Sequence, residues 1–112
     1  MKVLLDENLD HALRHLLGPH EVMTVAYMGW ASLKNGELLR TAEENGIEVF
    51  LTGDGTLHYE QNLSGRRLAV VTLSVIQLPI LRKHLPEIIE AIHKAEPGSL
   101  RLVDCGSFSR KK

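Results

Sequence analysis

The sequence of 112 residues contains a single cysteine, Cys105, so it cannot form a disulfide within the chain. Nothing therefore indicates an oxidising compartment, and we expect Cys105 to be a small packing residue. No apolar run approaches the roughly 18 residues that a membrane-spanning helix needs. The amino-terminal segment also lacks the apolar stretch of a signal peptide. We therefore expect a cytoplasmic protein without a membrane partner.

The sequence also lacks internal repeats, low-complexity segments and the P-loop, GxGxxG and GxSxG patterns. Its length suits one domain, because a second would be too small to hold a core of its own. A hydrophobic content of 44% is ordinary for a globular protein and argues against disorder. We expect one domain over residues 1–105, followed by a basic, flexible tail over 106–112.

The net charge of −1 conceals an asymmetry between the two halves of the chain. Residues 1–60 contain four Lys or Arg and ten Asp or Glu, a balance of −6, whereas residues 61–112 contain nine and four, a balance of +5. An acidic half followed by a basic half suits a carboxylate metal site beside a phosphate-binding surface. A solvated surface with a basic tail explains the same pattern.

The hydrophobic pattern predicts alternating strands and helices. Such alternation favours a three-layer α/β/α fold around a mainly parallel sheet of four or five strands. Residues 26–33 are expected to form a loop and residues 58–63 a short helical turn. The expected strands cover residues 2–5, 21–25, 48–52, 67–72 and 100–103, and the expected helices cover 9–17, 35–45 and a segment beginning near Pro86.

Carboxylates follow two of the predicted strands. Asp6 comes directly after the first strand and Asp54 after the third, so both should lie at the carboxyl edge of the sheet, where ligands of such folds bind. Glu37, at the start of the second helix, is a candidate third member. Clustered carboxylates repel one another unless a cation neutralises them, and Mg²⁺ or Mn²⁺ is the natural candidate.

Each of these residues also has a purely structural explanation. Asp6 or Asn8 could cap the following helix, although Asn8 can do so alone. Asp54 lies between two glycines, as in a tight turn, and Glu37 would be favoured by the helix dipole in any case. His11 and His15 have the spacing of zinc ligands on a helix, but no further ligand completes the set, and we expect a solvated pair.

Three segments together resemble the PIN-like superfamily of metal-dependent ribonucleases, and most closely its short bacterial, toxin-like branch. Leu-Leu-Asp-Glu-Asn-Leu, the opening of that branch, is present as residues 4–9. Asn35-Gly36-Glu37-Leu38-Leu39 matches an Asp-x-Glu-Ile-Leu helix start, and residues 52–57 match Thr-x-Asp-x-Asp-Phe. The resemblance covers about residues 1–75 and departs from the pattern at Asn35 and Thr56, where acids are expected.

The resemblance implies hydrolysis of RNA phosphodiesters at a Mg²⁺ or Mn²⁺ site formed by Asp6, Glu37 and Asp54. The missing acids imply weaker metal binding and reduced activity. Single-stranded RNA is the expected partner, together with an antitoxin protein, and a homodimer is left open. The RNA backbone would contact the basic residues of the second half: Arg66, Arg67, Arg82 and Lys83.

Two other readings compete with a nuclease. A catalytically weakened module that binds nucleic acid or protein explains the absent acids at Asn35 and Thr56. A receiver-like phosphoacceptor domain explains Asp54 after the third strand and Thr72 after the fourth. That family requires a lysine after the fifth strand, where this chain has Asp104-Cys105-Gly106.

Overall fold

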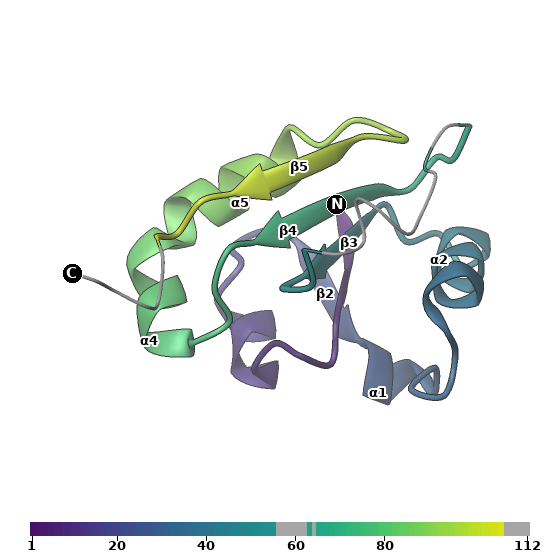
Figure 1. The fold of residues 1–112 in the computed structure, drawn as a ribbon, viewed down its shortest axis with the longest axis horizontal. Helices are drawn as coiled ribbons and strands as arrows, with labels where there is room; N and C mark the ends of the chain where they lie inside the picture. Colours follow the sequence, from purple (N-terminus) through teal and green to yellow (C-terminus); the bar gives the residue numbers. More distant parts are fainter. Residues whose placement is uncertain (56–62, 64, 107–112) are drawn as a thin grey trace.

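The computed structural model describes residues 1–55, 63 and 65–106. Its centre is a five-stranded sheet with the order β2-β1-β3-β4-β5, and all neighbouring strands are parallel (Figure 1). The prediction of an α/β protein with a parallel sheet is thereby confirmed. The strands are β1 (Lys2–Leu5), β2 (Glu21–Thr24), β3 (Val49–Thr52), β4 (Ala69–Leu73) and β5 (Leu100–Val103).

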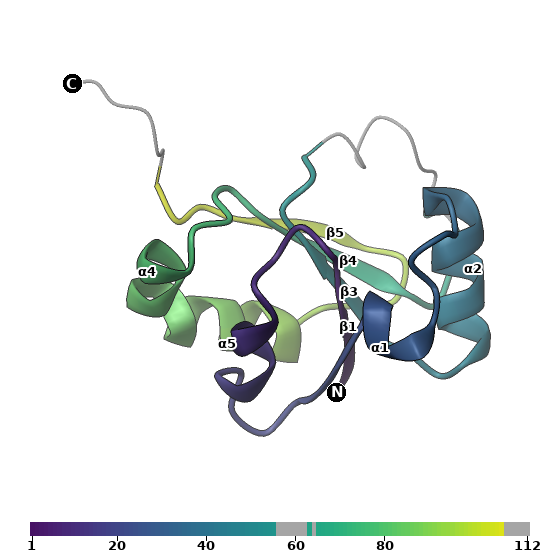
Figure 2. The same ribbon diagram turned by 90° about the horizontal axis from the view of Figure 1, so that it is seen from below.

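The sheet has a hydrophobic core on each face because successive residues of a strand point to opposite sides. Leu4, Phe50 and Val70 are in register across three strands and belong to the core beneath α1 (Val25–Met28) and α2 (Asn35–Glu44). The other core takes in the following strand positions, Leu5, Leu51 and Val71. It is completed by η1 (His11–His15), α4 (Leu78–Leu81) and α5 (Leu85–His93), while η2 (Arg82–His84), which has no buried residue, connects α4 to α5 (Figure 2).

The first predicted helix is shorter and tighter than expected. The pattern over residues 9–17 predicted an α-helix, but the structure has the 3-10 helix η1, with Leu9, Leu13 and Leu17 buried as the apolar stripe required. Asp10 is the N-cap and accepts a hydrogen bond from the Ala12 N–H at 2.9 Å. The expected caps, Asp6 and Asn8, are instead occupied at the end of the sheet.

A short helix stands where residues 26–33 were expected to form a loop. Thr24 ends β2 and caps α1, since its Oγ1 accepts a hydrogen bond from the Tyr27 N–H at 3.0 Å. The helix ends at Gly29, whose φ of 78° is a left-handed conformation that glycine adopts without strain. The loop prediction was therefore wrong for the first part of this segment.

The later helices agree with the prediction. α2 covers Asn35–Glu44 and α5 begins with Pro86 in its first turn. Cys105 is buried in the core beneath α5, and burial raises the pKa of its thiol, with Glu87 and Asp104 adding to the effect. The predicted turn over residues 58–63 and the tail from 107 onward lie outside the described residues, apart from Leu63. No helix in the part that the structure describes is both long and apolar enough to cross a membrane.

A buried histidine joins β2 to α5. His20 is only 9% exposed, with Nδ1 lying 3.3 Å from the amino group of Met1 and Nε2 lying 3.3 Å from the Ile89 carbonyl oxygen. Burial lowers the pKa of His20, and the amino terminus and His93 lower it further, against the opposing effect of the Ile89 carbonyl. Protonating this side chain therefore works against folding.

We predict that this histidine makes stability depend on pH just below neutrality. The unfolded chain takes up a proton on His20 near its ordinary pKa of 6.5, before the folded chain does, so stability present above pH 6.5 is lost as the pH falls. Urea unfolding between about pH 7.5 and 5.5 should show this loss, and His20→Gln should reduce it. Replacing the exposed His15 by Gln should leave the slope unchanged; an equal slope in all three proteins would contradict the prediction.

Candidate functional site

The carboxyl edge, formed by the ends of β1 and β3, holds the first two predicted acids. The main-chain N–H of Asp6 donates to the Leu51 carbonyl at 2.9 Å, so the pairing of β1 with β3 continues one residue beyond β1. Asp6 is thereby aligned with Thr52 on the α2 side of the sheet. Asp54 follows two residues later, and both acids are half-buried.

The hydroxyl of Thr52 connects the two acidic segments. It donates to Asp6 Oδ2 at 2.6 Å and accepts from the main-chain N–H of Asp54 at 3.0 Å. Asp6 Oδ1 accepts from the Glu7 N–H at 2.8 Å. Because Thr52 is fully buried, these bonds hold the Asp6 carboxylate in one orientation. The sequence analysis did not single out Thr52, although a hydroxyl that ends an apolar strand two residues before Asp54 was a usable signal.

A second threonine lies beside the first. Thr52 and Thr72 are partners in the register of β3 and β4, so their side chains share one face of the sheet. Thr72 is 1% exposed, and its Oγ1 has no hydrogen-bond partner among the residues that the structure describes. The row from Asp6 to Thr72 therefore ends in a buried hydroxyl that can still donate and accept.

The loops at the carboxyl edge are closely packed. The Asn8 side chain accepts a hydrogen bond from the Gly53 N–H at 3.3 Å, which links the segment after β1 to the segment after β3. A Cβ atom at Gly53 would lie 2.2 Å from Ile76 Cγ2 and 3.5 Å from Leu9 Cδ2. The absence of a side chain at Gly53 is therefore what lets the segment after β4 approach the site.

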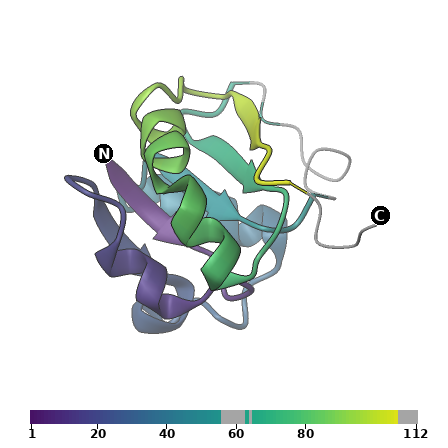
Figure 3. The ribbon, with the colours of Figure 1, turned by 90° about the vertical axis from the view of Figure 1, so that its left-hand side faces the viewer.

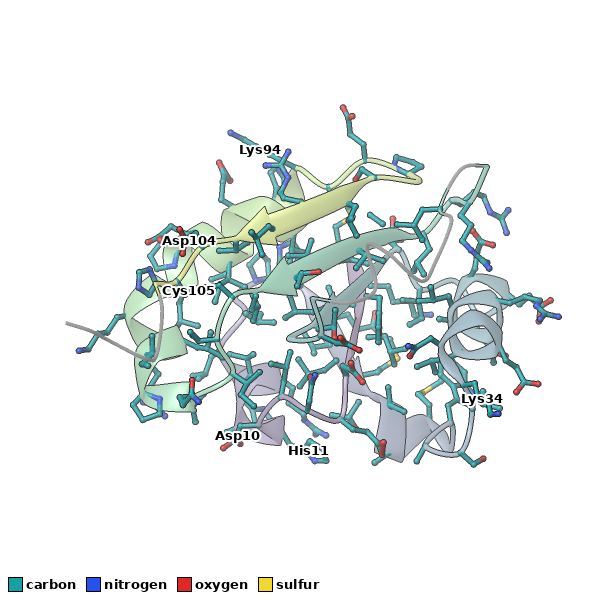
Figure 4. All side chains as sticks on the ribbon, in the orientation of Figure 1. Asp10, His11, Lys34, Lys94, Asp104 and Cys105 are labelled. Carbon is teal, nitrogen blue, oxygen red and sulfur yellow. The ribbon has the colours of Figure 1, made fainter. Side chains whose placement is uncertain are left out.

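The third predicted acid does not complete a cluster. Glu37 is exposed in the first turn of α2. Across residues 1–55, 63 and 65–106, no three His, Cys, Asp or Glu side chains are grouped so that they could hold a metal ion. Thr56, the second departure from the expected motif, lies outside the described residues. His11, labelled in Figure 4, and His15 are both exposed, as expected for a solvated pair.

The four basic residues predicted to contact RNA differ in whether their side chains are paired or exposed. Arg66 Nη1 lies 3.6 Å from Glu43 Oε1, while Glu43 Oε2 accepts hydrogen bonds from the main-chain N–H groups of Arg67 and Leu68. The Arg67 hydrogen bond lowers the pKa of Glu43, helped by Leu68 and by the charge of Arg66 and opposed by burial. The ion pair between Arg66 and Glu43 therefore helps to hold the segment before β4 against α2. The side chains of Arg67, Arg82 and Lys83 are exposed.

Comparison with known proteins assigns the chain to no class. No family model matches it, and no curated protein or solved structure shows significant similarity to it. The functional argument therefore rests on the carboxyl edge itself.

We predict that Gly53→Ala destabilises the protein by about 1 kcal/mol, because the new methyl group overlaps Ile76 Cγ2 and the Ile76 side chain, which is 41% exposed, must shift. Replacing Ile76 by Ala removes the overlapping atom, so Gly53→Ala should cost much less in that background. Chemical unfolding of the wild type, both single variants and the double variant measures the coupling. Additive effects would show that the two residues do not meet.

Proposed function

We propose that the chain is a PIN-like domain with a three-layer α/β/α architecture. Three features support this assignment: the parallel sheet, the helices packed against each of its two cores, and the motif acids Asp6 and Asp54 at one edge. The sheet order also places β1 between β2 and β3. The connection from β1 to β2 therefore runs one way along the sheet, and the connection from β2 to β3 runs the other way. Ligands of open α/β sheets bind at such a switch point, beyond the carboxyl ends of the strands.

The proposed activity is metal-dependent hydrolysis of RNA. The observation that carries it is the position of the Thr52 hydroxyl at the carboxyl ends of β1 and β3. This hydroxyl forms hydrogen bonds with both the Asp6 carboxylate and the Asp54 main chain. A buried hydroxyl that orients a half-buried carboxylate is typical of a site whose acid must keep one position.

The residues present suit a hard divalent cation. Mg²⁺ is commonly held by one or two carboxylates, while water and substrate phosphates complete its coordination. Asp6 and Asp54 would hold Mg²⁺ or Mn²⁺, and Glu37 remains a predicted further ligand. When bound, such a metal would act as a Lewis acid on the phosphodiester. Thr52 would orient Asp6 by the hydrogen bond to Oδ2.

The proposed substrate is single-stranded RNA, with backbone phosphates contacted by Arg67, Arg82 and Lys83. These exposed cations belong to the half of the chain whose balance is +5. Arg66 would contribute less, since it is paired with Glu43. In a toxin role, the partner protein would be an antitoxin that blocks this edge.

A receiver-like phosphoacceptor is the second candidate. The order β2-β1-β3-β4-β5 is one that receiver domains also have. Thr72, at the position of their switch hydroxyl, has an Oγ1 without a hydrogen-bond partner in the described part of the chain. Against it, Asp104 and Cys105 follow β5 where that family uses a lysine. A stable phosphoryl adduct on Asp54 after treatment with acetyl phosphate would favour this second candidate.

We predict slow RNA cleavage that is faster with Mn²⁺ than with Mg²⁺. A site short of carboxylates penalises Mg²⁺, which gives up its water reluctantly and demands strict geometry, whereas Mn²⁺ binds such ligands more readily. Asp6→Asn should abolish cleavage and lower the melting temperature only modestly, because the two side chains are almost isosteric although the amide has one acceptor oxygen for the donors at Thr52 and Glu7. The measurement is cleavage of a labelled single-stranded RNA by the purified proteins.

Thr52 provides the matched pair of controls. Thr52→Val removes the hydroxyl at nearly constant shape and should lower cleavage by about 10–100-fold, whereas Thr52→Ser should retain most of it. Equal cleavage by wild type and Asp6→Asn would assign the activity to a contaminant. RNA binding without cleavage would favour the binding module.

A further inference from the structure

The strand β5 leaves one side of the sheet open. It is the last strand in the order and pairs with β4 alone among the described strands. The Val70 N–H donates to the Ser99 carbonyl, and the Ser74 N–H donates to the Val103 carbonyl. By the alternation of a parallel ladder, the main-chain groups of Leu100, Leu102 and Asp104 point away from the sheet. We call this side the β5 margin; Figure 3 shows β5, in yellow, at the edge of the sheet next to β4.

One face of the β5 margin is apolar and exposed. Leu100 and Leu102 are in register with Val70 and Thr72, so they point to the side of the sheet that α1 and α2 cover elsewhere. Their exposed fractions are 38% and 55%. Edge strands are normally protected from other chains by lysine, proline or a bulge. Two exposed leucines on an open strand are instead typical of a strand that pairs.

The other face of the β5 margin is a charged groove of about 690 Å³ between α5 and β5. The helix and the strand run in opposite directions, joined by a turn at Gly98 (Figure 1). Among the residues that line it, Lys94 follows the end of α5 and Arg101 is near the start of β5, whereas Glu87 is near the start of α5 and Asp104 follows the end of β5. Glu90 also lines the groove, and its Oε2 lies 3.3 Å from Lys94 Nζ, so Lys94 is paired within α5. Arg101 carries the remaining positive charge of the basic end, whereas Glu87 and Asp104 make the other end acidic.

We propose that two copies of the chain pair through β5 in antiparallel fashion about a two-fold axis, which joins their sheets into one of ten strands. A two-fold axis reverses the direction of the second copy, so the basic end of each groove meets the acidic end of the other. The interface is independent of the metal site, because it uses the side of the sheet and not the carboxyl edge.

The charges also select the register. The outward main-chain groups form hydrogen bonds only in registers where Leu100, Leu102 and Asp104 of one copy lie opposite members of the same set in the other copy. In those registers the facing side chains also lie on a common face of the joined sheet. A two-fold at Arg101 would place like charges directly opposite, which is unfavourable. A two-fold at Leu102 places this leucine opposite its own copy, Arg101 opposite Val103, and Leu100 opposite Asp104.

The test is sedimentation equilibrium of the full chain over a wide concentration range, with a set of variants. The wild type should show a monomer–dimer equilibrium, and Leu102→Lys should weaken it at least about tenfold, since two lysines would face each other at the axis. Tyr27→Lys adds the same charge at another exposed hydrophobic position, 76% exposed on α1, and should leave dimerisation unchanged. Thermal melting verifies that each variant folds.

Charge reversal tests the direction of pairing. Arg101→Glu and Asp104→Arg should each weaken the dimer, and the double variant should recover much of the loss, because it exchanges the two ends of the groove. Hydrogen exchange at the Leu102 amide should also slow as concentration rises. A monomer at every concentration, or a dimer indifferent to Leu102→Lys, would overturn the proposal.

Discussion

The hydrogen bond from the Thr52 hydroxyl to Asp6 Oδ2, 2.6 Å long, is the interaction on which the proposed site depends. The same oxygen accepts the main-chain N–H of Asp54, so one buried side chain fixes the ends of two neighbouring strands. Because Thr52 is fully buried, its hydroxyl has no contact with solvent and depends on these two partners. Losing the hydroxyl would leave a carboxylate oxygen and an amide without their partner, and the orientation of Asp6 would be lost with them.

The parallel sheet turns separate sequence motifs into one site. Crossover connections bring every strand back in the same direction, so segments 48 residues apart in the chain, at Asp6 and Asp54, emerge at the same edge. The same arrangement leaves β5 as a lateral strand with nothing beyond it in the described part of the sheet. The proposed catalytic site and the proposed dimer interface therefore occupy different sides of one sheet and do not compete.

The sequence was informative where burial alone determines structure. A short run of apolar residues such as Val49–Thr52 is typical of a strand that is buried on both faces of a parallel sheet. All five strands of the sheet were predicted. Local hydrogen bonds were harder to predict. Asp10 shortened the first helix to η1, and Thr24 started a helix in a segment that had only loop-like features, because both effects depend on one side chain reaching one amide.

For the candidate site, the sequence predicted the positions of the two acids but not the side chains that contact them. The shared edge of Asp6 and Asp54 followed from their positions after strands, whereas the role of Thr52 required its register with Asp6. The pairing of Arg66 with Glu43 joins residues far apart in sequence, and no local pattern indicates it. Glu37 was included because it begins the second predicted helix and matches the motif, and the helix that carries it leaves its side chain exposed.

A crystal soaked in Mn²⁺ and measured for anomalous scattering tests the central claim most directly. The account predicts a peak at the carboxyl edge within about 2.5 Å of carboxylate oxygens from both Asp6 and Asp54. The same soak of Asp6→Asn crystals should lose that peak. No peak at this edge in saturating Mn²⁺, or a peak that survives the Asp6→Asn substitution, would contradict it.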